Sequence, residues 1–213
     1  MKKYELTAEF IEKWGKKLFR IKALIGFGSV EAGELGGYVE KEDNLAQNGN
    51  AWVFDDAEVY GNARVYGNAE EYGNAWVFDD AWVFDDARVY DDAEVYGNAR
   101  VYGNAEVYGN ARVCGNAEVY GNARVYDDAD YLLIGRIGSR FSFTTFFKNK
   151  DKGITVSCGC FLGTIAEFRA KVTDTHGNNK HAKMYNLAAD MAELQILGEE
   201  HFDKLNTNKS EPF

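Results

Sequence analysis

The sequence predicts a mainly β protein, in which a solenoid of three-sided, 18-residue coils is followed by a small C-terminal α+β module. A six-residue phrase occurs thirteen times over residues 51–128, and Ala returns as its first residue every sixth position. A fixed short period is typical of repeat architectures. Inside each phrase, Ala and Val at positions one and three alternate with charged or aromatic residues at positions two and four. This alternation indicates a strand with one buried face.

Residues 1–50 are predicted to form a cap and an irregular first coil, because the open end of a solenoid exposes unpaired strand edges. The segment LFRIKALI alternates as a strand does, and we expect a hairpin that turns near Trp14–Gly15. A helix over Ala8 to Phe19 is the competing interpretation.

Positions five and six of each phrase are corners, written either Gly-Asn or Asp-Asp. Gly adopts positive φ freely, and Asn and Asp tolerate it better than most residues. The acidic corners lie at 55–56, 79–80, 85–86, 91–92 and 127–128. On one side they lie two coils apart, about 10 Å, which is too far for one Ca²⁺ ion, so we interpret them as solvated corners.

The charges at position two indicate three phrases per coil. Acidic residues and Arg alternate from one phrase to the next, interrupted only by Trp. A coil of three phrases stacks residues 18 apart, and the resulting pairs are all opposite in sign, which favours this stacking, whereas a coil of two phrases would stack like charges. The pairs are Glu70–Arg88, Arg88–Glu106, Glu94–Arg112, Arg100–Glu118, Glu106–Arg124 and Arg112–Asp130.

The same arithmetic stacks the aromatic residues of position four into three outward columns. Large exposed apolar stripes usually contact something, whereas self-supporting tyrosine ladders are the plainer alternative. If the columns bind a partner or a second copy, the expected interface residues are Trp52, Trp76, Trp82, Tyr72, Tyr90 and Tyr108, since Trp and Tyr dominate interface energetics.

Glu71 departs from the repeat, because it stands where Val is expected to face inward. A lone buried carboxylate costs several kcal/mol, about the cost of an unpaired charge in a protein interior. A local bulge or a drifted copy is the plainer interpretation. A buried ligand or proton site is the alternative.

Residues 131–213 are predicted to form the α+β module. FSFTTFF and GITVSCGCF are β-like, and two helices follow. Thr164 and Glu167 form a capping box at the first helix, Gly177 suits its end, and Asn178 or Asn179 suits the start of the second. The second helix is expected from about Lys180 to His201, with an apolar face of Met184, Leu187, Met191, Leu194 and Leu197.

Composition narrows the function classes. The formal charge is −10, and residues 51–130 hold 17 acidic residues against 5 Arg. Such an acidic body repels phosphates, which argues against direct nucleic-acid binding. We find no stretch with the length of a membrane span and no signal peptide. Three cysteines without an export signal favour reduced thiols in a cytoplasm.

The phrase AEVYGNARVYGNA resembles the hexapeptide repeats of left-handed parallel β-helices. The flanks IKALIGFGSVEAGELGGYVEKEDNLAQNGNAWVFDDA and GITVSCGCFLGTIAEFRAKVTDTHGNNKHAKMY resemble uncharacterised β-solenoid proteins of phages, prophages and gut bacteria. The resemblance implies a left-handed coil and phage or mobile-element origin, in the cytoplasm of a bacterial host. The similarity to hexapeptide acyltransferases is distant.

Those acyltransferases use catalytic His residues, and a zinc-dependent carbonic anhydrase class of this fold uses His ligands. Here no His precedes His176, so the solenoid lacks the base and the imidazole ligands for such chemistry. We therefore expect no enzyme, and the sequence assigns no catalytic residue, no metal and no cofactor. An enzyme in the C-terminal module is a distant third hypothesis.

Candidate ligand-binding residues all lie in the C-terminal module. Arginines and hydroxyls suit an anion, although such residues are more often simply solvated. Two Cys and two His could bind zinc, but C-x-C departs from the usual C-x₂₋₄-C spacing, so thiols packing the module are the plainer interpretation. The candidates are Arg136, Ser139, Arg140, Thr144, Thr145, Cys158, Cys160, His176, His181 and Tyr185.

Two functions fit the sequence. In the first, a rigid oligomerising solenoid carries a module that sequesters a small anionic ligand or a host protein. In the second, the acidic solenoid imitates nucleic acid and inhibits a host nucleic-acid-binding defence protein. Both predict a binding protein that contacts neither nucleic acid nor membrane, and we expect a homo-oligomer.

Overall fold

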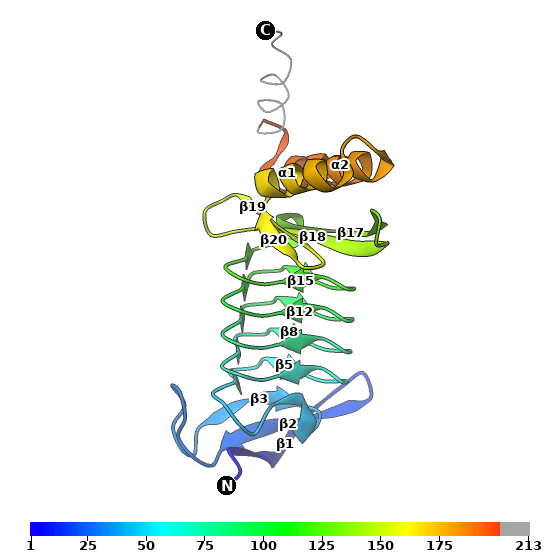
Figure 1. Ribbon diagram of the computed structural model, residues 1–213. Helices are drawn as coiled ribbons and strands as arrows, with labels where there is room; N and C mark the ends of the chain where they lie inside the picture. Colours follow the sequence, from blue (N-terminus) through cyan, green and yellow to red (C-terminus); the bar gives the residue numbers. More distant parts are fainter. Residues whose placement is uncertain (201–213) are drawn as a thin grey trace. The chain divides into compact units, whose positions relative to one another are not determined.

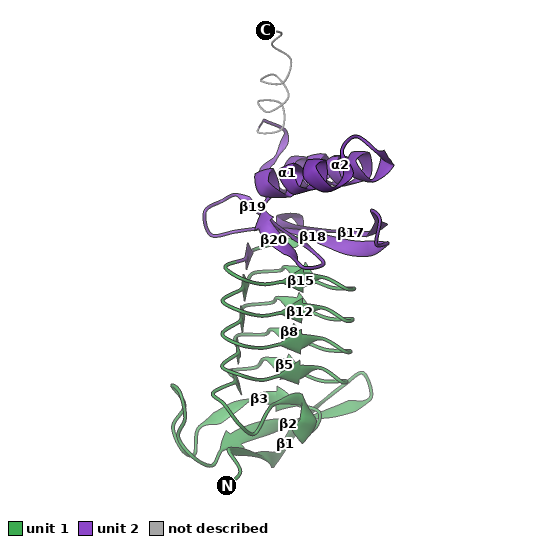
Figure 2. Ribbon diagram, viewed as in Figure 1, with its two compact units in different colours: residues 1–122, 126–128 green, residues 123–125, 129–213 purple. Residues whose placement is uncertain are grey.

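The computed structural model describes residues 1–200, and the chain divides into two compact units (Figure 2). The solenoid unit comprises residues 1–122 and 126–128, and the C-terminal unit comprises residues 123–125 and those from 129 onward. The protein is mainly β, with a parallel β-solenoid and a C-terminal sheet accompanied by two helices, as predicted (Figure 1). No helix of the described residues is long and apolar enough to span a membrane.

Each repeat phrase contributes one strand of two residues, at its positions two and three. The thirteen strands are β4 (Trp52–Val53), β5 (Glu58–Val59), β6 (Arg64–Val65), β7 (Glu70–Glu71), β8 (Trp76–Val77), β9 (Trp82–Val83), β10 (Arg88–Val89), β11 (Glu94–Val95), β12 (Arg100–Val101), β13 (Glu106–Val107), β14 (Arg112–Val113), β15 (Glu118–Val119) and β16 (Arg124–Val125).

Parallel pairing joins every third strand, which confirms the three-phrase coil. Within the solenoid unit, β4, β7, β10 and β13 form one side, β5, β8, β11 and β14 the second, and β6, β9, β12 and β15 the third. Ala and Val of the phrase point inward and are buried along the whole array. The register places Arg88 between Glu70 and Glu106. Glu94 pairs with Arg112, and Arg100 with Glu118, as the charge pattern predicted.

Four of the five acidic corners adopt the predicted left-handed backbone, and the fifth, at 127–128, does not, because it leads into a 3-10 turn at Asp128–Asp130. Asp55, Asp79, Asp85 and Asp91 have φ between 50° and 59°, and glycines fill the corresponding positions of the Gly-Asn corners. These corner positions require glycine for two reasons, the positive φ angle and the close packing of the next coil. A Cβ on Gly67, for example, would lie 2.9 Å from the backbone nitrogen of Asp85 in the next coil.

The aromatic columns are stacked ladders. Along Phe54, Tyr72, Tyr90, Tyr108 and Tyr126, neighbouring ring centroids lie 4.4 to 5.1 Å apart with interplanar angles of 4° to 10°. Most of these rings are half-buried by their neighbours. Self-supporting ladders therefore describe the columns better than continuous exposed apolar stripes do.

The cap begins with an antiparallel hairpin. Strand β1 (Tyr4–Lys13) pairs with β2 (Lys16–Ala23), and the turn is at Trp14–Gly15, as predicted. The competing helix over Ala8 to Phe19 is wrong, because this segment alternates its side chains between two faces as a strand does. Strand β3 (Leu35–Val39) follows and joins the second side of the solenoid in parallel to β5.

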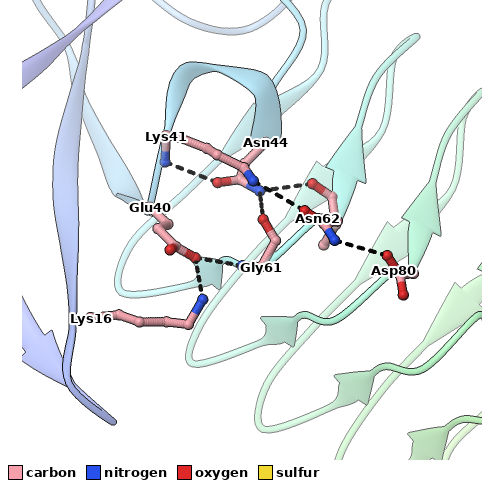
Figure 3. Close-up of polar contacts among 8 residues, drawn as sticks. Lys16, Glu40, Lys41, Asn44, Gly61, Asn62 and Asp80 are labelled. Carbon is pink, nitrogen blue, oxygen red and sulfur yellow. Dashed lines mark hydrogen bonds and ion pairs between the residues drawn. The ribbon is translucent and has the colours of Figure 1, made fainter.

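A polar network fastens the cap to the first regular coil (Figure 3). Asn44, in the 3-10 turn η1 (Glu42–Asn44), is fully buried and donates its amide to the carbonyls of Gly61 and Ala63 at 3.3 and 2.8 Å. Glu40 accepts from the Gly61 amide and from Lys16, both at 2.7 Å. Backbone groups that an open solenoid end would leave unpaired thus find side-chain partners.

Glu71 points into the core and does not bulge. It pairs in register with Val53 on one side and Val89 on the other, and its side chain is fully buried. Neither carboxylate oxygen has a hydrogen-bond partner. Burial raises the pKa of Glu71 to about 8, so at neutral pH the carboxyl is mostly protonated. The local bulge is therefore wrong, because Glu71 keeps the register of its strand on both sides, whereas the interpretation as a drifted copy of the repeat is not tested.

The C-terminal unit contains an antiparallel sheet and two helices. The sheet order is β17 (Tyr131–Ile137), β18 (Ser142–Lys148), β19 (Ile154–Cys158) and β20 (Phe161–Thr164). The 3-10 turn η2 (Asp128–Asp130) precedes it, and there Asp130 forms an ion pair with Lys148 at 2.6 Å. Asp130 is therefore not at the strand position that the charge ladder assigned to it.

Helix α1 (Ile165–His176) and helix α2 (Lys180–Leu197) follow; both ends of α1 and the start of α2 are as predicted, and α2 ends before the predicted residue. Thr164 and Glu167 form the capping box, and the Asn179 side chain accepts from the amides of His181 and Ala182. Helix α2 ends at Leu197, and His201, the predicted end, lies outside the described residues.

The predicted apolar face of α2 does not form the core. Four of its residues, Met184, Leu187, Met191 and Leu194, are 39% to 63% exposed. Instead, the buried face consists mainly of small residues together with Tyr185 and Ile196, and it packs with Phe146, Val156 and Phe168. Small side chains face the sheet and α1 because they allow close packing, and the larger ones are left at the surface. The buried alanines are Ala182, Ala188, Ala189 and Ala192.

Candidate functional site

A cavity of about 270 Å³ in the C-terminal unit brings together six of the ten predicted ligand-binding residues. We call it the C-terminal pocket. The predicted residues that line it are Ser139, Arg140, Cys158, Cys160, His176 and Tyr185. Sequence reasoning missed Ser142, Gly159, Phe161, Phe168, Lys171, Val172 and Thr175, which also line it.

Turns and helix faces position these side chains. Ser139 and Arg140 lie in the turn that follows β17, and Cys158, Gly159 and Cys160 surround the turn between β19 and β20. Gly159 has φ of 62°, and a Cβ there would lie 3.3 Å from the Nη1 of Arg140. The two turns therefore meet at this edge of the sheet. Helix α1 contributes a face with the 3- and 4-residue spacing of a helix, from Phe168 through Lys171, Val172 and Thr175.

Tyr185 is the buried wall of the pocket. Its hydroxyl lies against the backbone of Gly138, where an added Cβ would be only 1.8 Å from the oxygen. Its ring stacks on that of His176, with centroids 5.8 Å apart, and packs edge-on against Phe168. Burial, followed by the neighbouring Cys158 thiol, raises the pKa of Tyr185 to about 12. The phenol therefore stays protonated and can donate a hydrogen bond.

The electrostatic character of the pocket is basic. Arg140, Lys171 and His176 line it, and among residues 1–200 no Asp or Glu does. Three hydroxyls, from Ser139, Ser142 and Thr175, add hydrogen-bonding groups, while the phenyl rings of Phe161 and Phe168 supply apolar surface. Charged donors around an apolar cavity suit an anion that also carries an apolar or planar part.

The other four predicted residues lie elsewhere. Arg136 is exposed and does not line the pocket. Thr144 is buried and donates to the Cys158 sulfur at 3.2 Å, so it supports a pocket residue from behind. Thr145 is buried in the sheet, and His181 lies beside His176 with ring centroids 5.8 Å apart, outside the pocket lining.

The sulfur and imidazole groups do not assemble as a metal site. Within residues 1–200, no three His, Cys, Asp or Glu side chains lie close enough together to hold an ion. All three cysteines are free thiols; Cys158 is half-buried and Cys160 is exposed. The C-x-C pair therefore shapes the pocket wall, with one thiol directed to Thr144.

Of the predicted interface residues, Trp52 is not available to a partner. It is fully buried in the cap, where Tyr4 and Phe27 pack edge-on against its indole. Trp76 and Trp82 are half-buried on the second and third sides of the solenoid. Tyr72, Tyr90 and Tyr108 lie within one stacked ladder.

Comparison with known proteins finds a similarity within the repeat. A family model described as the YdcK β-solenoid repeat matches residues 57–71 and 93–109. Both stretches lie inside the hexapeptide array, so the similarity concerns the solenoid and not the C-terminal pocket. No curated protein matches the chain.

Proposed function

We propose that this is a non-enzymatic binding protein, encoded by a phage or mobile element and acting in a bacterial cytoplasm, that sequesters a small anionic ligand in the C-terminal pocket. The observation that carries the proposal is the convergence of Arg140, Lys171 and His176 on one cavity that no carboxylate of the described residues lines. Arginine and lysine beside hydroxyl donors are the groups that bind phosphates and carboxylates in proteins.

The size of the cavity limits the ligand. At about 270 Å³ it is near the lower bound for small-molecule sites, which suits a mononucleotide or a smaller organic phosphate or carboxylate. The rings of Phe161, Phe168 and Tyr185 can contact a planar part of the ligand, while the basic side chains neutralise its charge. The free thiols and the imidazole contribute to the lining of the cavity, and the proposal includes no reaction at them.

Binding as a homo-oligomer is part of the proposal. The exposed residues of α2 follow a 3-4-3 spacing, which is that of a coiled-coil seam. Such a seam fits a helix of the same kind from a second copy better than it fits an irregular surface. The stacked tyrosine ladders of the solenoid need no partner, so we place the contact between copies on α2.

Two neighbouring arginines offer a matched test. We expect Arg140→Ala to weaken the binding of AMP and of inorganic phosphate at least tenfold, since it removes a pocket charge. Arg136→Ala removes the same charge from an exposed position nearby and should leave binding within about twofold, the range expected for a distant screened charge. Isothermal titration measures both variants, and native mass spectrometry of gently purified protein detects bound ligand and the number of copies.

Equal loss of binding in the two variants would show that only general surface charge matters. Absence of binding in the wild-type protein, together with no added mass on the natively purified protein, would contradict the proposed pocket function.

A further inference from the structure

Beyond the first phrase, where Trp52 is buried in the cap, the charge ladder of the solenoid is interrupted at two adjacent phrases, and one of them lacks the positive charge that the repeat places there elsewhere. On the first side, Arg88 lies between Glu70 and Glu106. On the second side, Trp76 occupies the equivalent place, in register between Glu58 and Glu94. Where the repeat elsewhere sets a guanidinium between two carboxylates, this side has only an indole.

A groove of about 540 Å³ lies over this place. The hairpin residues Ile11 and Lys13 form part of its wall, and Trp76, Tyr38 and Asn74 line the solenoid face. The groove also holds four carboxylates, from Asp56, Glu58, Asp92 and Glu94, and within the described part of the chain only one cationic side chain, that of Lys13, lines it. All of these residues belong to the solenoid unit.

The cap itself places one cationic side chain, that of Lys13, in this groove. The Lys13 ammonium forms an ion pair with Glu58 and lies 5.1 Å from the centroid of the Trp76 ring. This single ammonium does not satisfy the carboxylates. Glu58 is only 3% exposed, and its Oε2 atom is buried without a hydrogen-bond partner. A buried carboxylate oxygen without a partner is costly, so a further donor in the groove would be stabilising.

The other carboxylates have partial partners. Arg20 lies 3.4 Å from Asp56, and Arg112 lies 3.7 Å from Glu94, and neither arginine lines the groove. Asp92 accepts a hydrogen bond from Asn74 at 3.0 Å. The part of the groove near Asp92 and Glu94 is therefore negatively charged and has an aromatic wall. The ammonium of Lys13 does not neutralise this part, because it is paired with Glu58.

The second interruption shows which cation fits a tryptophan at this position of the repeat. On the third side, Trp82 lies in register between Arg64 and Arg100. Their guanidinium carbons lie 6.0 and 5.1 Å from the ring centroid of Trp82. A guanidinium on an indole face is a favourable cation–π arrangement. The solenoid thus already contains the contact that an external guanidinium would make with Trp76.

We propose that the groove beside Trp76 binds the guanidinium group of a ligand, stacked on the indole and held by Glu94, Asp92 and Glu58. The group replaces the arginine that the repeat omits here. The binding site is independent of the C-terminal pocket and has the opposite charge preference.

The test uses Nα-acetyl-L-arginine amide as the probe and Nα-acetyl-L-citrulline amide as its uncharged control of nearly the same shape. Isothermal titration, with NMR of the indole N–H signals, should show saturable binding of the arginine probe, weakened by salt, and at least tenfold weaker binding of the citrulline probe. A Gly-Gly-Arg-Gly-Gly peptide distinguishes the source. Tighter binding of the peptide indicates an arginine side chain of a partner protein, and equal binding indicates a small molecule.

A variant that restores the charge ladder at Trp76 gives the most direct test. Trp76→Arg places in the groove the residue that the repeat uses elsewhere, so the variant should fold and its binding of the probe should fall at least tenfold. Trp82→Glu restores the ladder on the neighbouring side and should leave binding unchanged. Equal binding of arginine and citrulline probes, or full binding by a folded Trp76→Arg protein, would overturn the proposal. Neither result bears on anion binding, which Arg140→Ala tests separately.

Discussion

The solenoid and the C-terminal unit solve the problem of building a core in different ways. In the solenoid, every inward position of the repeat except Glu71 is Ala or Val, and the same pair repeats along each side, so local pattern and final packing coincide. In the C-terminal unit, the large apolar residues of α2 lie at the surface and its alanines are buried. The difference teaches that the hydrophobic pattern identifies the buried face where backbone hydrogen bonds between identical strands fix the distance between neighbouring coils. It fails when two helices and a sheet must also fit against one another.

Glu71 is the exception to the uniform core of the solenoid, and replacing it should give the largest change in stability of the variants considered. Glu71→Val restores the residue of the neighbouring copies and should raise the free energy of unfolding at pH 7 by about 3 kcal/mol. At this pH the folded wild-type protein keeps a proton that the unfolded chain has lost, which costs about 1.4 kcal/mol for each of the roughly 2.5 pH units between the ordinary pKa of 4.5 and pH 7. Chemical denaturation measures the gain. Glu70→Val, on the outward face of the same strand, is the control and should change stability by less than about 1 kcal/mol.

The same residue predicts a pH dependence. Folding raises the pKa of Glu71 from 4.5 to about 8. Between these values the folded state holds a proton that the unfolded chain has lost, so wild-type stability should fall as pH rises through this window. The difference between Glu71→Val and wild type should therefore widen from pH 4.5 to pH 8 and stay constant above it. A difference that is independent of pH would show that the carboxyl is not buried.

The two faces of α2 test the second half of the comparison. Ala189 is fully buried, so Ala189→Leu should overpack the core and lower the free energy of unfolding by about 2 kcal/mol. Leu187 is 63% exposed, and Leu187→Gln should change it by no more than about 0.5 kcal/mol in the monomer. Thermal unfolding at low protein concentration measures both. The reverse order of the two effects would mean that the larger side chains form the core after all.

The smallest expected effect concerns the start of α1. Thr164 accepts a hydrogen bond from the Glu167 amide, and the Glu167 carboxylate accepts one from the Thr164 amide. Thr164→Ala should therefore cost about 1 kcal/mol, while Thr164→Ser, which keeps the hydroxyl, should cost less. These hydrogen bonds also lower the pKa of Glu167, so the capping contribution should be lost as pH falls through that lowered value. Equal stability of the Ala and Ser variants at pH 7 would contradict this role of the hydroxyl.

Much of the candidate site could be predicted, but only as a set of residue types. The chain carries Ser139 and Arg140 close together and Cys158 and Cys160 close together, and these pairs do meet at one pocket. Arg136 could not be separated from Arg140 in advance, because both precede β18 in similar surroundings. Lys171 was missed because a lysine on a helix is usually solvated, and only the packing of α1 shows which lysine faces the cavity.

The groove beside Trp76 illustrates the same limit in the solenoid. The interrupted ladder can be read from the sequence once the coil is known to hold 18 residues. That the hairpin would place Lys13 over Trp76 and leave the Oε2 of Glu58 without a partner depends on how the cap folds back onto the second side. Sequence periodicity carries no information about that docking.

The sequence by itself determined the coil of the solenoid, its three sides, its inward and outward residues, the stacking of charges and rings, both ends of α1 and the start of α2. These features depend on neighbours at constant spacing along the chain or on local capping groups. Only the tertiary structure decided that Glu71 stays in register, that Trp52 is buried under the cap, which face of α2 is buried and which polar residues share a pocket. Each of these depends on packing between segments without a common period, and there shape and volume outweigh the hydrophobicity of any single residue.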